Sequence, residues 1–160
     1  MQQENTIIQY LQHLSELTKG ARGGEIYQQA LQKAQTVKVI STADAVGKLN
    51  AKKVVEWLDI QLKACYRNAL LTAIALECDY VEGYMAYEKY AVPFEHAWCY
   101  KDGKYFDPTA DFALKTKESR TYVQLVRVNY AEALAISRKV GYTGNILNTL
   151  VQQEVKRKTI

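Results

Sequence analysis

Apolar residues recur at helical spacing through the first third of the chain. In Gln3–Lys19 they form one face of an amphipathic helix, and the glycine-rich run that follows ends it. A second helix is expected over Glu25–Thr36, and Val37–Ile40 is either a short strand or the tail of that helix. A third helical stretch follows an N-cap at Ser41 or Thr42. Residues 1–60 are therefore predicted to be mainly helical.

The middle of the chain changes from a helical to an extended pattern. Asn68–Leu76 is apolar nearly all round and contains small alanines, which is typical of a helix buried against a sheet. Cys65 is expected in the first turn of this helix, although no glycine or proline marks a new helix start. Tyr80–Tyr87 is rich in aromatic residues and is predicted to be a strand.

A hairpin is predicted immediately afterwards. Phe94–Tyr100 and Lys104–Thr109 flank Asp102-Gly103, a pair that favours a two-residue turn in which both residues have positive φ. With that turn, Lys101 faces Lys104, Trp98 faces Asp107 and His96 faces Thr109. Side chains alternate along a strand, so the same four residues His96, Trp98, Asp107 and Thr109 are expected on one face.

The last quarter of the chain supplies one more strand and two helices. Thr121–Val128 alternates as a strand that is expected to join the sheet beside the hairpin, with Tyr122, Gln124, Val126 and Val128 on one face. Asn129 is expected to cap a helix that runs to about Lys139, and a final helix ends in the basic run 156–158. Alternating helices and antiparallel strands indicate an α+β fold with additional helices at both ends.

Three residues of the central segment point to nucleophilic chemistry. At a helix N-terminus, free backbone N–H groups and the helix dipole favour the thiolate form of Cys65. His96 and Asp107 are diagonal neighbours in the expected hairpin register, and a carboxylate in that position orients an imidazole and supports its cationic form. The residues themselves therefore predict a Cys65–His96–Asp107 catalytic set.

The same segment resembles the transglutaminase-like superfamily, a branch of the papain-like cysteine enzymes. The resemblance rests on Cys65 at a helix start, on residues 80–84 (YVEGY), on residues 96–98 (HAW) and on residues 107–109 (DPT), in that order. It covers about the middle third of the chain, and the residues that flank Cys65 depart from the common pattern. It implies a papain-like core in which the helix carrying the cysteine packs on a small antiparallel sheet, with a Cys-His-Asp triad.

The resemblance also raises candidates for supporting roles. Papain-like enzymes use a glutamine upstream of the cysteine to stabilise the oxyanion, which makes Gln61 a candidate donor, although its spacing is shorter than in papain. Trp98 and Tyr84 are candidates for substrate binding, or they fill the interface between sheet and helix, as large aromatic residues often do. Cys78 and Cys99 are expected to be structural. Cys99 alternates away from His96, so a His-x-x-Cys metal site is not expected, and no metal or organic cofactor is required.

Composition narrows the class of protein. The 160 residues fit a single domain, divided into a helical part (1–60), a transglutaminase-like catalytic core (61–128) and C-terminal helices (129–160). The net charge of +4 is mild and scattered, so binding to nucleic acid is not expected. No apolar run is long enough to cross a membrane. Three cysteines without a disulfide-like spacing suggest a reducing compartment, so we expect a cytoplasmic protein.

These observations predict a thiol hydrolase or acyltransferase that works through a thioester acyl-enzyme. The expected substrate is a peptide, a protein or a small amide, and the oligomeric state is left open. Hydrolysis is favoured, since the sequence shows no site that would hold an acceptor amine and exclude water. The alternative is a non-catalytic protein-binding module on the same fold.

Overall fold

The computed structural model describes residues 2–90, 92–115 and 117–140 and six positions beyond residue 140. Its helices are α1 (Gln2–Leu17), α2 (Glu25–Lys33), α3 (Thr42–Val46), α4 (Lys48–Trp57), α5 (Cys65–Leu76) and α6 (Tyr130–Val140), with a π-helix η1 (Thr109–Leu114). Its strands are β1 (Gln35–Val37), β2 (Val39–Ile40), β3 (Asp79–Tyr87), β4 (Phe94–Lys101), β5 (Lys104–Phe106) and β6 (Arg120–Asn129). The α+β class is confirmed. The predicted final helix falls mostly on positions outside the described residues.

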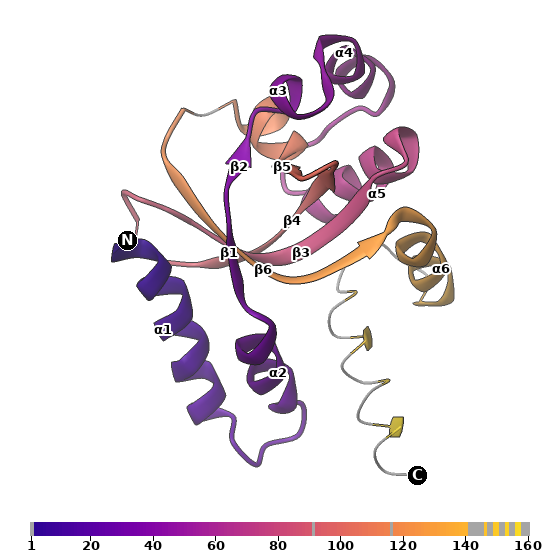
Figure 1. The fold of residues 1–160 in the computed structure, drawn as a ribbon. Helices are drawn as coiled ribbons and strands as arrows, with labels where there is room; N and C mark the ends of the chain where they lie inside the picture. The colour runs from indigo at the N-terminus through magenta and orange to yellow at the C-terminus, as the bar shows by residue number, and fades with distance from the viewer. Residues whose placement is uncertain are drawn as a thin grey trace.

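The six strands form one sheet in the order β1-β6-β3-β4-β5-β2. All neighbouring pairs are antiparallel except β2 and β5. The two edge strands, β1 and β2, are consecutive in the chain, with only Lys38 between them. This short connection brings the two edges of the sheet towards each other, so the sheet curls. In Figure 1, β1 and β2 run as one continuous segment across the curled sheet.

Helices cover the outer face of the curled sheet, and aromatic residues fill its inner face. One outer cluster joins α5 and α6 to Tyr80, Ala97, Cys99 and Phe106. A second outer cluster joins α1 and α2 to Tyr84, Ala86, Val123 and Leu125. The inner cluster consists of Val37, Val81, Met85, Trp98 and Tyr122. The molecule therefore has apolar layers on both faces of the sheet.

The predicted hairpin is confirmed, but it ends earlier than expected. Asp102 and Gly103 have φ of 49° and 83°, as a two-residue turn with two positive φ angles requires, and Lys101 pairs with Lys104. The ladder stops after β5, at Phe106. Asp107 therefore follows the strand, and Thr109 begins η1. The expected pairing of His96 with Thr109 is wrong, because the chain leaves the sheet before it reaches that position.

Strand β6 occupies a different place and register from those predicted. It pairs with β3 on the side away from the hairpin, and a β-bulge shifts the register between Glu82 and Gly83. Because one extra residue reverses the alternation, Val126 and Val128 face outwards with the helices, whereas Tyr122 lies in the inner cluster. The single alternating pattern predicted for this strand is wrong for that reason.

The remaining differences from the predicted helices are breaks in the N-terminal part of the chain. Helix α2 ends at Lys33, and Thr36, which was expected to be helical, belongs to β1. The third helical stretch is two helices, separated by Gly47 with φ of 89°. Ser41 caps the first of these, as its hydroxyl oxygen accepts a hydrogen bond from the Asp44 N–H at 3.1 Å.

Gly83 is the position at which the bulge tolerates no side chain. A Cβ atom there would lie 2.0 Å from the Val123 carbonyl oxygen and 2.8 Å from the Trp98 ring. We expect Gly83→Ala to lower the free energy of unfolding by about 3 kcal/mol, because the backbones of β3 and β6 must separate. Urea unfolding measures this change. Gly103→Ala adds a Cβ in open space but places alanine at a φ of 83°, so it should cost only about 1 kcal/mol of backbone strain. An equal cost for both variants would contradict the steric explanation.

Candidate active site

Cys65 is the first residue of α5, as the catalytic prediction requires. No glycine or proline starts this helix. Instead, Asp59 and Lys63 adopt positive φ angles of 48° and 58° in the preceding loop, which turns the chain away from α4. The Cys65 side chain is half-buried, so it remains accessible from solvent.

Two side chains of α5 hold the preceding loop against the helix. Asn68 is completely buried; its Nδ2 donates to the Gln61 carbonyl oxygen at 2.7 Å and to Thr109 Oγ1 at 2.9 Å. Its Oδ1 accepts from the Gln61 N–H at 3.2 Å. Arg67 donates to the Asp59 carbonyl oxygen at 2.9 Å. These bonds fix the start of α5, and through Thr109 they connect it to the segment that carries Asp107.

His96 and Asp107 form a buried ion pair. His96 Nε2 lies 2.7 Å from Asp107 Oδ2, and the two residues are 3% and 1% exposed. His96 comes from β4, and Asp107 comes from the turn that follows β5, so adjacent strands bring them together. This contact agrees with the expected neighbourhood of the two residues, although Asp107 is no longer part of the hairpin ladder.

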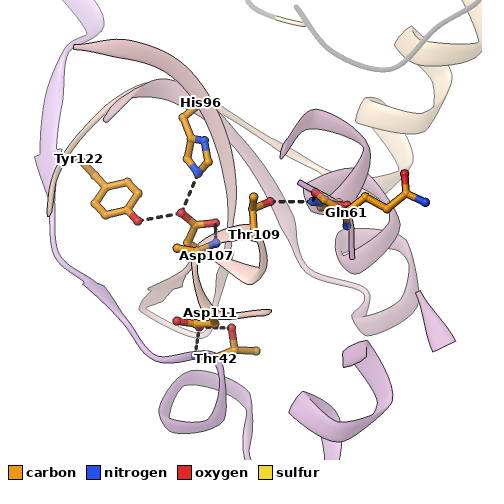
Figure 2. A network of polar contacts seen from close by, with 9 residues as sticks. Thr42, Gln61, His96, Asp107, Thr109, Asp111 and Tyr122 are labelled. Atoms are coloured by element: carbon orange, nitrogen blue, oxygen red, sulfur yellow. Dashed lines mark hydrogen bonds and ion pairs between the residues drawn. The ribbon is translucent and has the colours of Figure 1, made fainter. Parts of the chain in front are cut away.

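Two further hydrogen-bond donors hold the Asp107 carboxylate in place. The Tyr122 hydroxyl donates to Oδ2 at 2.8 Å, and the Ala110 N–H donates to Oδ1 at 3.1 Å. Figure 2 shows the carboxylate between His96 and Tyr122, with the separate Thr42–Asp111 contact further away. A carboxylate with this many donors is fixed in one orientation, which in turn fixes the imidazole plane.

The environment favours the ionic form of the pair. Burial alone would lower the pKa of His96, but the charge and hydrogen bond of Asp107, together with a hydrogen bond to Cys65 and its charge, raise it to about 10. Burial would likewise raise the pKa of Asp107, but the interactions with His96 and Tyr122 lower it. His96 is therefore protonated at neutral pH.

The two predicted substrate-binding aromatic residues have different surroundings. Trp98 is 0% exposed and lies roughly parallel to the His96 ring, with centroids 6.2 Å apart, and edge-on to Tyr122 at 5.1 Å. It therefore supports His96 from within the inner cluster and presents no surface to a substrate. Tyr84 lies on the outer face, where it lines a pocket.

Gln61 has its backbone near the site, but its side chain points elsewhere. Its Nε2 donates to Asp59 Oδ2 at 2.8 Å on the exposed surface, and Figure 2 shows the amide directed away from His96. Gln61 therefore does not supply an oxyanion donor in this conformation. The free N–H groups of the first turn of α5 are better placed, because that turn contains Cys65 itself.

The other two cysteines lie in the outer core. Cys99 is fully buried, and its Sγ donates to the Ala69 carbonyl oxygen at 3.4 Å. Burial raises the pKa of the Cys99 thiol, as do a hydrogen bond and charge from Cys78. Among the described residues, no group of three His, Cys, Asp or Glu side chains is arranged to hold a metal ion.

Two residues of the site, Tyr122 and Asn68, were not identified from the sequence. Tyr122 looks like any strand aromatic, and only the bulge beside Gly83 places it in the inner cluster. Asn68 left a weak signal, since it is a polar residue within a helix that is otherwise apolar nearly all round.

Comparison of the chain with protein-family models, curated proteins and solved structures finds no match. Within the described residues, no helix has both the length and the apolar character needed to cross a membrane. The chemical interpretation therefore depends on the geometry of the site itself.

Proposed function

We propose that the protein is a cysteine hydrolase of the transglutaminase-like, papain-like type, which cleaves amide bonds through a thioester on Cys65. The observation that carries this proposal is the buried His96–Asp107 pair, together with Cys65 close enough to the same imidazole to help raise the pKa of His96. A structural role alone gives no reason to place a half-exposed thiol at a helix N-terminus beside a buried imidazolium.

Each residue has a defined chemical task in this mechanism. The Cys65 proton resides on His96, and the thiolate attacks the carbonyl carbon of the amide. When the tetrahedral intermediate collapses, the C–N bond breaks and His96 gives its proton to the leaving amine. His96, now neutral, accepts a proton from water, which attacks the thioester and releases the acid and the Cys65 thiolate.

The oxyanion of each tetrahedral intermediate is stabilised by backbone N–H groups in the first turn of α5. These groups have no partner within the helix, and the positive end of the helix dipole lies at the same place. Removal of a single oxyanion donor typically slows an enzyme by on the order of 10²- to 10³-fold, so this contribution is large. Asp107 and Tyr122 act through the orientation of His96 and contact no substrate.

Trapping of the acyl-enzyme tests this function directly. After incubation with p-nitrophenyl acetate and an acid quench, intact-protein mass spectrometry should show one acetyl group, and peptide mapping should place it on Cys65. Hydroxylamine should remove it, as expected of a thioester. Cys65→Ala should abolish this adduct. Cys99→Ala, which removes a thiol from the core only, should retain it.

Two outcomes would contradict the proposal. Acetylation of Cys78 or Cys99 in the folded protein would identify a different nucleophile. Loss of the adduct in folded Cys99→Ala would show that Cys65 alone is not sufficient.

A further inference from the structure

A pocket opens on the outer face of the sheet beside the proposed nucleophile. It lies between α2, the start of α5 and the strands β3 and β4, and its space amounts to about 410 Å³ when the solvent at its open mouth is included. Tyr66, which directly follows Cys65, forms part of its wall. Cys65 is among the charges that raise the pKa of Tyr66, so the proposed nucleophile lies close to this wall of the pocket.

The pocket combines negative charge with aromatic walls. Its two charged lining residues are Glu82 and Glu95, and none of its described lining residues is basic. Glu82 is 4% exposed and accepts hydrogen bonds from the Tyr80 hydroxyl at 2.6 Å and the Ile146 N–H at 2.7 Å. Glu95 is exposed at the rim, 3.5 Å from the Tyr66 hydroxyl. One carboxylate is thus anchored inside the pocket, and the other is exposed at its mouth.

The phenol groups of Tyr66 and Tyr84 stay neutral. Burial raises the pKa of Tyr66, and the charges of Glu95 and Glu82 raise it further. Burial and the charge of Glu95 likewise raise the pKa of Tyr84. Neutral aromatic rings next to carboxylates are the surroundings that bind ammonium and guanidinium groups, through ion pairing and through the negative face of the ring.

We infer that this pocket is a specificity site for a cationic side chain, lysine or arginine, on the residue whose carbonyl Cys65 attacks. The inference rests on the proposed function and specifies its substrate class. Glu95 forms the ion pair with the incoming cation, Tyr66 and Tyr84 hold its aliphatic stem and charged head, and Glu82 adds negative potential from within. A neutral side chain of equal length would gain only the apolar contacts.

Peptidyl chloromethyl ketones test this specificity, because Cys65 would displace chloride and form a stable thioether. Blocked lysyl, arginyl, norleucyl and glutamyl reagents are compared with iodoacetamide, and peptide mass spectrometry locates the adduct. Norleucine matches lysine in length but has no charge. We expect Cys65 to react about tenfold faster with the lysyl or arginyl reagent than with the norleucyl one, and most slowly with the glutamyl one.

A matched pair of variants distinguishes the effect of the Glu95 charge in the pocket from a general effect of the charge of the protein. Glu95→Gln should reduce the preference for lysyl over norleucyl by about fivefold. Glu56→Gln removes the same charge from the exposed surface of α4 and should leave the preference unchanged.

The failures of the two proposals are distinguishable. If Cys65 reacts rapidly with iodoacetamide but does not prefer the cationic reagents, or keeps the preference in Glu95→Gln, the specificity site is wrong and the hydrolase proposal stands. If Cys65 is inert to iodoacetamide and to every chloromethyl ketone, the hydrolase proposal itself fails.

Discussion

Replacement of His96 by alanine is expected to slow the alkylation of Cys65 by iodoacetamide at pH 6 by about 100-fold. A free thiol with a pKa of about 8.5 is well under 1% ionised at that pH. In the wild-type protein, burial lowers the pKa of His96, but the charge and hydrogen bond of Asp107 raise it to about 10, so the proposed mechanism has an imidazolium available beside Cys65 throughout the acidic and neutral range. Peptide mass spectrometry after timed alkylation gives the rate for each cysteine separately.

The other cysteines provide internal controls for this experiment. Cys78 and Cys99 are buried and should react slowly in the folded wild-type protein and in the folded variant. His96→Gln is a second variant, in which an amide N–H can still donate to Asp107; it should lose the reactivity while keeping the fold. Rapid alkylation of Cys65 at pH 6 in either folded variant would rule out a thiolate–imidazolium pair.

Asp107→Asn is expected to slow acylation of Cys65 by on the order of 100-fold. Burial lowers the pKa of His96, and the Asp107 charge is the largest factor that opposes this effect. Without that charge the imidazole should lose its proton near neutral pH. The chain has two histidines, so two Hε1 ring resonances are expected in the NMR spectrum. The His96 resonance should remain that of the protonated form up to about pH 9 in the wild type, and should titrate at lower pH in the variant.

Asp111→Asn is the matched control for Asp107→Asn. Asp111 Oδ2 accepts hydrogen bonds from the Thr42 N–H at 2.8 Å and from its hydroxyl at 2.6 Å, so this carboxylate connects η1 to α3. Its removal should cost about 1–3 kcal/mol of unfolding free energy and leave acylation and the His96 titration unchanged. If both variants slow acylation equally, the effect of Asp107 is one of general stability and not of charge on His96.

Local signals predicted the elements that carry the site. The Asp102-Gly103 pair fixed the hairpin and hence the neighbourhood of His96 and Asp107. The apolar run before Leu76 predicted the buried helix with Cys65 at its start. These inferences succeeded because each depends on a turn or on a periodicity within a few residues.

Features that depend on distant pairing were not predictable in the same way. The bulge at Gly83 brings its backbone close to Val123 and Trp98, which lie 40 and 15 residues away in the chain, so only glycine fits there. The break before Cys65 depends on left-handed conformations at Asp59 and Lys63, which tertiary bonds from α5 hold in place. The pocket combines Tyr27, Tyr66, Glu82 and Glu95 from four elements, and its formation requires the complete fold.

The curled sheet also limits how early the fold can form while the chain is being synthesised. β1 and β2 leave the ribosome early, but β2 pairs with β5 at Tyr105 and Phe106, and β1 pairs with β6 at residues 122–124. Until those partners have emerged, this short segment has no strand to join, and contacts of such large sequence separation form slowly. The strands β3, β4 and β5 would then form an open ladder until β6 emerges, and the sheet would acquire its final curvature only at that point.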